Sequence, residues 1–598
     1  MKHYITLGIG LLLAATAYAQ NLNPTVQVTN AYEGKLMEVE KQNIPMAVPD
    51  SLLQFDWNFN YSVFDNPYKG AYEFNPYLVE MKPDPVPFDG KNLYVRAGAG
   101  YTLHPEVQAV WTPELKGRFK VTVYDDFKGY WGKYSGFNGD LKGLTPDFSG
   151  EYFETEILPD STYVGNEIGN RFGVKAGVVT KPVTLSFDGQ FNWLNALWDG
   201  RTELNNAFGQ SYVLGAKSNF TSAFSFDAAL RFDGMSNHPQ QFDSNVTDEG
   251  YIFDKRLHEN DLGADLLLIY NITGPLSFRI KGSYDHTYFR TVEDENEFLI
   301  GDWLNISPMC TYEGDRASIS AGVKFSDVWK NKDFSDEECY KGKKIYPQLE
   351  ASYEVIKDAL VASAFLTGGQ KFNTYASLLE ANHFLPINSS LNYFSTLGDA
   401  SVNTFDAGIA FSGRIKSVFQ YKIDGGYARY YNAPMEGLRL DYYTDRPLLR
   451  YVMANYDLLY ADINGSWRSD RVDASALFRL QKMELTKDSA PALSAPHFVG
   501  KADFTYNWNR RIFAGVSAEW STLRKVRIPY YITDTSNEIP FYFITPGWVD
   551  LGVNAEFKMN SKLSFWLKGS NLLGKPVMRN FLIAEKGPYV TVGICLVL

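Results

Sequence analysis

The sequence has little positive charge and, after its first residues, no long apolar run. Its 598 residues include 57 lysines and arginines against 69 aspartates and glutamates, a formal net charge of -12. Nucleic-acid binders concentrate basic residues to neutralise phosphates, so this balance argues against that class of protein. After residue 19 no apolar run reaches the ~18 residues of a membrane-spanning helix, which excludes a helical membrane protein.

Cysteine and recognisable catalytic motifs are also scarce. The three cysteines are Cys310, Cys339 and Cys595, and none forms a C-x-x-C pair. An odd, sparse set of this kind indicates neither a disulfide framework nor a zinc or redox site, so we interpret them as unpaired structural thiols. The sequence has no nucleophile elbow, metalloprotease, Walker or dinucleotide motif. We therefore expect no enzyme activity, no cofactor and no metal site.

Acidic residues are plentiful, but their spacing favours no chemistry. The adjacent pairs at 125–126 (Asp-Asp) and 285–286 (Asp-His) could be imagined as acid groups of a barrel hydrolase. Neighbouring residues of a strand point to opposite faces, so neither pair forms a ready dyad. The stretches 293–297 and 333–338 carry carboxylates of the kind that hold Ca²⁺. They match no known calcium loop, and we interpret them as solvated exterior loops.

Aromatic residues and strict alternation are what the sequence does contain. Tyrosine, phenylalanine and tryptophan make up 15% of the chain, which suits a protein with aromatic belts. In 185–193, apolar residues alternate with polar ones, and 277–283, 318–325 and 550–558 repeat the pattern. Strand side chains point to the two faces in turn, so each segment has one apolar and one polar face. The pattern continues from residue 91 to 598 without a domain break.

The predicted strands are joined alternately by short and long connections. The short ones centre on 116–117, 181–182, 221–222, 273–274, 314–315, 357–358, 416–417, 469–470, 509–510 and 560–561. The long ones fall near 128–161, 196–208, 234–256, 289–301, 327–343, 370–401, 431–448, 483–496, 523–546 and 571–587. A barrel whose rims face different compartments has this alternation, although the first connection, at His104-Pro105, is short where a long one is expected. We predict an all-β, transmembrane, antiparallel up-and-down β-barrel of about 22 strands, within a range of about 18 to 22.

The N-terminus predicts export. Residues 7–15 form an apolar run too short to span a bilayer, and Ala17-Tyr18-Ala19 is a small-x-small cleavage site. We expect three parts: a cleaved signal peptide at 1–19, an N-terminal periplasmic or lumenal segment at 20–90, and a barrel at 91–598 in the outer membrane of a Gram-negative bacterium. Outer-membrane lipid is then one expected partner.

The last strand carries a candidate assembly signal. The closing sequence TVGICLVL has polar-x-Gly-x-x-apolar-x-apolar form, and it looks like the signal read by outer-membrane assembly machinery, with Leu598 in place of the usual Phe. Its key positions are Thr591, Gly593, Leu596 and Leu598. The alternation would turn Ile594 to lipid and Cys595 to the lumen.

Charged residues on the polar strand faces are candidates for the lumen lining. They are Asp188, Arg279, Lys281, Arg479, Glu519, Glu556 and Lys568. Inside a barrel such charges are wetted or paired, and they set the field and the selectivity.

Residues 562–598, KLSFWLKGSNLLGKPVMRNFLIAEKGPYVTVGICLVL, resemble the end of TonB-dependent receptor barrels. In that family a penultimate strand runs into Asn-Leu-Leu-Gly, here 571–574, and a loop with a glycine, here Gly587, precedes the closing strand. Residues 368–388, GGQKFNTYASLLEANHFLPIN, are similar to a branch of such barrels in the Bacteroidetes lineage. The resemblance implies a transport or receptor role for an unidentified solute.

The chain departs from this family at its N-terminus. The family's barrels contain a much longer N-terminal plug, whereas only 71 proline-rich residues lie between Gln20 and Gly90. A TonB-binding box would also be needed, and 24–29 is only vaguely like one. We therefore keep an alternative, a non-transporting barrel subunit of a larger outer-membrane complex.

An unobstructed wide lumen would leak, so something is expected to fill it. Residues 20–90 could do so as a small internal plug, or could instead form an extra strand or an extended periplasmic arm. Other candidates are the long connections 128–161 and 370–401 folding inward, or a periplasmic or membrane protein partner.

Overall fold

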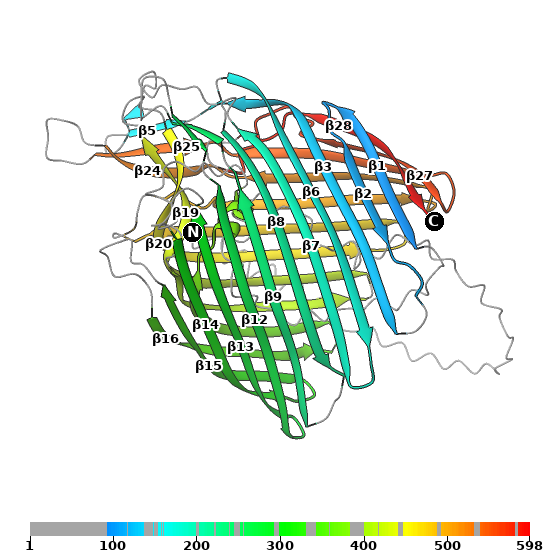
Figure 1. Cartoon of the computed structure of the whole chain (residues 1–598), viewed down its shortest axis with the longest axis vertical. Helices are drawn as coiled ribbons and strands as arrows, with labels where there is room; N and C mark the ends of the chain where they lie inside the picture. The colour runs from blue at the N-terminus through cyan, green and yellow to red at the C-terminus, as the bar shows by residue number, and fades with distance from the viewer. Residues whose placement is uncertain are drawn as a thin grey trace, which may run out of the picture. The chain divides into compact units, whose positions relative to one another are not determined.

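The computed structural model describes residues 92–115, 118–136, 147–148, 153–156, 158–159, 161–198, 203–219, 223–238, 240–243, 251–254, 256–291, 298–330, 342–357, 359–382, 400–416, 418–440, 447–486, 489, 492–530, 539–580 and 584–598 (Figure 1). Within them, one helix occurs, α3 (Tyr375–Ala381), and nearly everything else is strand. That helix is neither long enough nor apolar enough to cross a membrane. The sequence hypotheses for 1–19, 20–90, 293–297 and 333–338, and for Cys339, lie outside these ranges.

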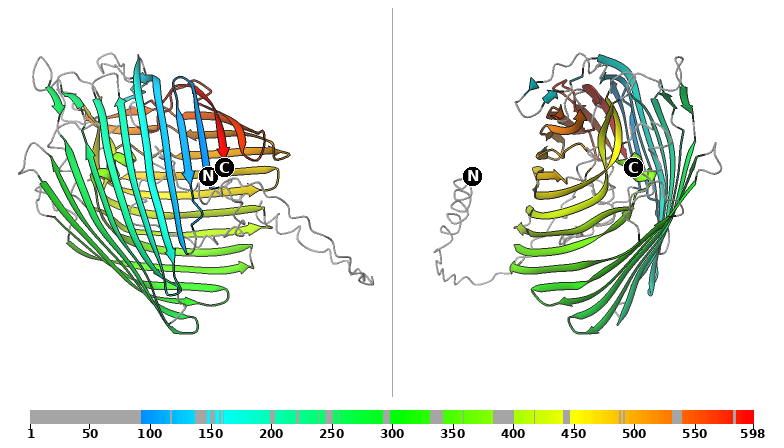
Figure 2. Two further views of the ribbon diagram at one scale, coloured as in Figure 1. Left: turned by 45° about the vertical axis from the view of Figure 1, so that its right-hand side comes forward. Right: turned by 90° about the vertical axis from the view of Figure 1, so that its left-hand side faces the viewer.

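Twenty-two strands form one closed antiparallel barrel, which confirms the predicted fold (Figures 1 and 2). They are β1 (Leu93–Tyr101), β2 (Glu106–Trp111), β3 (Phe119–Gly136), β6 (Ser161–Val179), β7 (Val183–Trp198), β8 (Glu203–Ser218), β9 (Phe224–Asn237), β12 (Leu257–Thr273), β13 (Leu276–Thr291), β14 (Phe298–Glu313), β15 (Ala317–Lys330), β16 (Gly342–Ile356), β17 (Leu360–Phe372), β18 (Ala400–Ile415), β19 (Phe419–Leu440), β20 (Pro447–Arg468), β21 (Val472–Leu485), β22 (Phe498–Trp508), β23 (Ile512–Ser521), β26 (Trp548–Lys558), β27 (Leu563–Ser570) and β28 (Tyr589–Val597). Each pairs with the next, and β28 pairs with β1 to close the cylinder. The Leu598 carbonyl oxygen completes this seam by accepting hydrogen bonds from the backbone N–H groups of Asn92 (2.7 Å) and Leu93 (2.9 Å).

Short turns gather at one rim and long connections at the other. Both ends of the barrel sequence lie at the short-turn rim, because β1 begins where β28 ends. The predicted short turns that lie wholly within the described ranges are confirmed, and residues with positive φ stand in some of them, such as Gly274 (50°) and Asn509 (50°). Such φ values suit the tight hairpin turns that match strand twist. Three predicted long connections are wrong in extent, because pairing continues to Trp198 and Glu203 in β7–β8, to Arg290 and Phe298 in β13–β14, and to Leu440 and Pro447 in β19–β20. The expected bounds were 196–208, 289–301 and 431–448.

The long-connection rim carries the remaining elements. The β10–β11 hairpin (Gln240–Asp243 and Tyr251–Asp254) extends the barrel sheet beyond β8. A separate four-stranded sheet contains β4 (Asp147–Phe148), β5 (Phe153–Glu156), β24 (Arg524–Tyr530) and β25 (Ile539–Thr545), so it joins segments far apart in the sequence (Figure 1).

The outer surface exposes large apolar side chains along most strands. Leu230, Leu262 and Ile409 are each more than half exposed, a pattern that lipid, not water, would cover favourably. Aromatic residues gather where strands reach the short-turn rim. They include Trp111, Phe119, Phe224, Tyr270, Tyr312, Tyr353, Trp467 and Trp508. This arrangement matches the aromatic girdle expected at the edge of a bilayer.

Candidate functional site

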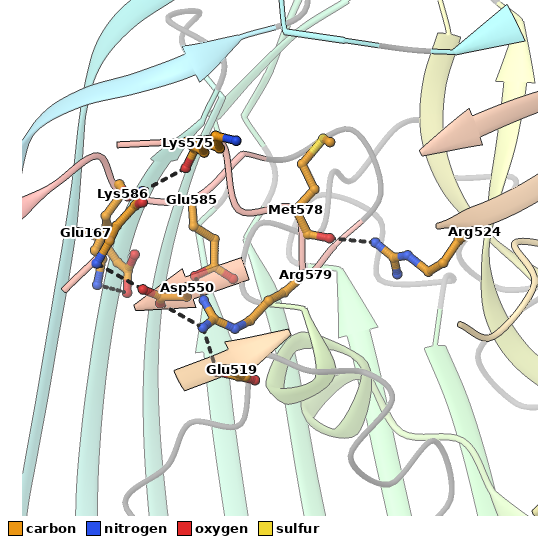
Figure 3. A network of polar contacts seen from close by, with 10 residues as sticks. Glu167, Glu519, Arg524, Asp550, Lys575, Met578, Arg579, Glu585 and Lys586 are labelled. Carbon is orange, nitrogen blue, oxygen red and sulfur yellow. Dashed lines mark hydrogen bonds and ion pairs between the residues drawn. The ribbon is translucent and has the colours of Figure 1, made fainter. Parts of the chain in front are cut away.

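In the connection between β27 and β28, the described residues 571–580 and 584–588 fold onto the inner wall of the barrel, and we call them the inner loop (Figure 3). It contacts Glu519 on β23, Asp550 on β26 and Glu167 on β6. These acidic residues point inward, since alternating strand neighbours such as Val549 are exposed on the outside. An apolar contact of Val577, Met578 and Ala584 with Trp548 adds to its anchoring, and all four side chains are buried.

The short first hairpin gives the inner loop its place. β1 and β2 stop well before β3 does, which leaves the upper part of β3 without its usual neighbour. Leu103 pairs with Trp131 there, and Lys586 of the inner loop pairs with Tyr134. The early turn at 102–105, which breaks the alternation of the connections, thus makes room for the inner loop.

Arg579 ties the inner loop to the wall. Its Nη2 lies 2.6 Å from Glu519 Oε2 and 3.1 Å from Asp550 Oδ2, and its Nη1 lies 2.5 Å from Glu585 Oε2 (Figure 3). The guanidinium also covers the Trp548 ring at 4.9 Å. Burial alone would lower the pKa of Arg579, but the three carboxylates outweigh it and raise that pKa. A planar five-donor group therefore donates hydrogen bonds to three acidic side chains at once.

A second group of contacts lies beside the first strands. Lys586 Nζ is 3.0 Å from Glu167 Oε1, and Lys568 Nζ is 2.9 Å from Glu106 Oε1. His104, in the 102–105 turn, stacks on Tyr589 with ring centroids 4.2 Å apart. Burial lowers the pKa of His104 to about 4, so the ring is neutral at pH 7.

A cavity of about 330 Å³ lies between these contacts and the wall. Among its lining residues are Glu519 and Lys568, which the sequence had marked as lumen candidates. Sequence patterns did not indicate Arg579, Glu585 or Lys586, because a loop has no alternation to reveal which side chains turn inward. No group of three or more His, Cys, Asp or Glu side chains in the described ranges is arranged to hold a metal ion.

The other predicted lumen residues lie apart from this cavity. Three contact oppositely charged partners on the strands: Asp188 with Lys175 (3.0 Å), Arg279 with Glu313, and Arg479 with Asp462 (2.7 Å). Lys281 pairs in register with Leu267 and Ser307, and Glu556 with Trp566 and Phe513. Their influence on solute selectivity stays a prediction.

The candidate assembly signal has structural roles of its own. The Thr591 hydroxyl lies 3.1 Å from His104 Nδ1, and Leu598 closes the seam as described above. A Cβ atom at Gly593 would lie 2.1 Å from the Ala97 carbonyl oxygen and 2.6 Å from the Trp566 ring, so only glycine fits there. Leu596 pairs with Val95 and Leu563 in the same seam. Recognition by assembly machinery stays a prediction.

The α3 segment also turns inward. The buried Glu259 carboxylate accepts hydrogen bonds from the backbone N–H groups of Tyr375 (2.5 Å) and Ala376 (2.8 Å). At its other end, Asn382 Nδ2 donates to Glu436 Oε1 on β19 at 3.0 Å. Residues 373–382 therefore link β12 to β19 inside the barrel. The sequence reading missed this helix, although its buried Tyr375, Leu378 and Leu379 have helical spacing.

Comparison with known proteins shows a shared fold. The FrpB iron transporter from Neisseria meningitidis has a TM-score of 0.60 at 10% identity, covering 85% of this chain and 81% of that one. The siderophore receptor PirA from Acinetobacter baumannii gives 0.58 at 10% identity (85% and 80%), and the copper transporter OprC gives 0.58 at 9% (85% and 80%). No family model matches the chain, and no curated protein matches it. The barrel architecture implied by the resemblance to TonB-dependent receptors is thus confirmed, and at these identities the likeness concerns the fold alone.

Proposed function

We propose that this chain is an outer-membrane transport or receptor protein whose inner loop controls passage of an unidentified solute. The observation that carries this proposal is the inner loop itself. It crosses the inner wall, and Arg579 ion-pairs it to two barrel strands above a polar cavity. Transporters and receptors with the same fold, such as the iron transporter FrpB, support the assignment. The resemblance of 368–388 favours the Bacteroidetes branch of these barrels.

The outer membrane of a Gram-negative bacterium is the proposed location. The exposed apolar band and the aromatic girdle support insertion in lipid. One rim has short turns and the other has long connections, and this difference supports the outer membrane in particular. Its barrels have short periplasmic turns and long exterior loops. With this orientation the chain enters β1 from the periplasm, where residues 20–90 could meet a periplasmic partner. The proposal includes the signal peptide at 1–19 and recognition of the last strand by assembly machinery.

A second function has one observation in its favour. Two inward segments, the inner loop and residues 373–382, are both anchored to the wall by buried polar contacts. Such anchoring suits a sealed barrel that serves as a non-transporting subunit of a larger envelope complex. We propose an enzyme role for neither alternative.

Conductance in planar bilayers separates the two functions. We compare the full mature chain, a chain lacking 20–90, and the Arg579→Gln variant, each purified in folded form. A transport barrel should conduct once the plugging element is released, either by the deletion or by the substitution. If all three proteins stay closed, the transport role is wrong, and a stoichiometric partner copurified in mild detergent would then support the sealed subunit.

A further inference from the structure

The cavity beside the inner loop is lined by buried acceptor oxygens that no donor in the described part of the chain satisfies. Asp126 Oδ1, Asn571 Oδ1 and Glu585 Oε1 have no hydrogen-bond partner among the described residues. Asp126 is 7% exposed and Asn571 4% exposed, so both are almost fully buried. A buried acceptor without a donor is destabilising, so three around one cavity favour a ligand that supplies donors.

The orientation of each free oxygen is fixed by the second polar atom of the same side chain. Asn571 Nδ2 donates to the carbonyl oxygens of Lys575 (3.0 Å) and Lys586 (3.1 Å), which determines where its oxygen lies. Asp126 Oδ2 lies 3.2 Å from Lys128 Nζ. Glu585 Oε2 binds Arg579, as described above. Each side chain therefore uses one atom for the architecture and leaves the other free.

Other groups around the cavity do not offset this excess of acceptors. Asn170 Oδ1 is also a buried acceptor without a partner among the described residues. Asn170, which pairs with Phe127, lies on the same face of β6 as Phe172, and that face is exposed on the outside. Its oxygen is therefore not one of the acceptors that the ligand would meet. Among the lining side chains that the structure describes, no nitrogen is buried without a partner. Among the lining cations, Lys568 contacts Glu106, Lys586 contacts Glu167, and Arg579 contacts Glu519. Another, Arg171, donates to the amide oxygen of Asn192.

We propose that this cavity binds a small organic cation that carries several N–H donors, such as an amine or a guanidinium compound. The proposal rests on the proposed transport or receptor function and names its substrate class. A cation of this kind has donors only and matches the free oxygens, whereas a sugar brings acceptors and an anion would face Asp126 and Glu585. The cavity volume of about 330 Å³ is large for a bare metal ion and lies at the small end of organic-ligand sites.

Calorimetric titration of the folded, full mature chain in detergent tests this proposal, with agmatine as the probe. The matched probe is 4-guanidinobutyrate, which keeps the guanidinium but replaces the ammonium with a carboxylate. We expect saturable agmatine binding, and binding of 4-guanidinobutyrate at least about tenfold weaker.

Two variants locate the site. Asp126→Asn and Glu585→Gln each keep the side-chain shape and should weaken agmatine binding about tenfold. The matched control is Asp227→Asn, whose carboxylate lies 3.7 Å from Lys217 away from the cavity, and it should leave the affinity unchanged. Heat-modifiable gel mobility verifies that each variant is folded.

The outcomes also separate this proposal from the proposed function. Absence of saturable agmatine binding, tighter binding of 4-guanidinobutyrate, or full affinity in both folded cavity variants would overturn the organic-cation site. Binding as expected in a barrel that never conducts would leave the site in place and refute transport. Conductance without agmatine binding would support transport and refute the organic-cation site.

Discussion

Lys586 pairs with Tyr134 in an antiparallel bridge, although the first residue belongs to the last hairpin and the second to β3. The Lys586 side chain reaches further along the wall, to Glu167 on β6. The inner loop is thus held by β27 and β28 at its ends and by the earliest strands along its length. Its position depends on side chains that can be changed one at a time.

Arg579→Gln should release the inner loop and raise single-channel conductance or open probability severalfold in planar bilayers. The substitution leaves Glu519, Asp550 and Glu585 without their shared cation. Removing one partner of a buried ion pair costs about 3–5 kcal/mol, enough to favour the detached loop.

The control for this experiment is Arg468→Gln. Arg468 pairs with Asp473 at the opposite rim, where both side chains are more than half exposed. Exposed pairs contribute little, so conductance should stay at the wild-type level. Equal conductance of Arg579→Gln and wild type would show that Arg579 does not close the pore.

Acidification should destabilise the barrel partly through His104. Its pKa is about 4 in the folded protein because of burial, against 6.5 for the free side chain, so the unfolded chain binds the proton first. Stability is then lost as pH falls from about 6.5 towards 4, by about 2–3 kcal/mol for this group. We predict a larger drop in urea midpoint between pH 7 and 4.5 for wild type than for His104→Phe, which keeps a ring against Tyr589.

Other groups titrate in the same range, so the difference between the two proteins is the readout. Glu106, Glu167, Lys568 and Lys586 act on His104 electrostatically and are present in both. Equal drops in urea midpoint for His104→Phe and wild type would contradict a contribution of His104 to acid destabilisation.

Gly593→Ala should reduce the amount of folded barrel, because a methyl group would collide with Ala97 and Trp566 in the closing seam. Overpacking of this kind costs about 1–3 kcal/mol. The measurement is the heat-modifiable fraction on gels after refolding in detergent. Gly169→Ala is the control, since a Cβ there meets nothing within 4 Å. Similar losses of folded barrel in Gly593→Ala and Gly169→Ala would show that the effect is common to strand glycines and is not specific to the closing seam.

The cysteines should report the topology. Cys310 is exposed on the outer face of β14 and Cys595 is buried. On whole cells, a membrane-impermeant maleimide should label Cys339 alone, since lipid covers Cys310. In detergent, a Cys339→Ser variant should react once, at Cys310, and Cys595 should require denaturation. Failure of Cys339 to react on intact cells would show that the two rims are assigned the wrong way round.

The sequence predicts the barrel well because its signals are local. Two-residue alternation identifies strands such as β7 and β26, and turn residues such as those around Gly274 and Asn509 identify the short rim. The strand count follows from the number of turns. The extent of a strand is less local, since β7 and β8 continue pairing to Trp198 and Glu203 where a loop was expected.

Only part of the candidate site can be predicted, because only its strand residues have a local signal in the sequence. Glu519 and Lys568 lie on strands, so alternation turns them inward. Arg579 comes from a connection, and nothing near it in the sequence indicates that Glu519 and Asp550 are its partners. Those contacts form only when β23, β26 and the inner loop meet in three dimensions. Helix α3 did have a local signal, and the surrounding alternation concealed it.

The inner loop belongs to the hairpin that completes the cylinder. Its contact from Lys586 to Glu167 joins residues 419 positions apart in the sequence, and β28, which follows the loop, is the strand that pairs with β1. The pairing that closes the wall therefore also brings the loop to β3 and β6. A substitution that weakens the β1–β28 seam would loosen the seating of the loop at the same time.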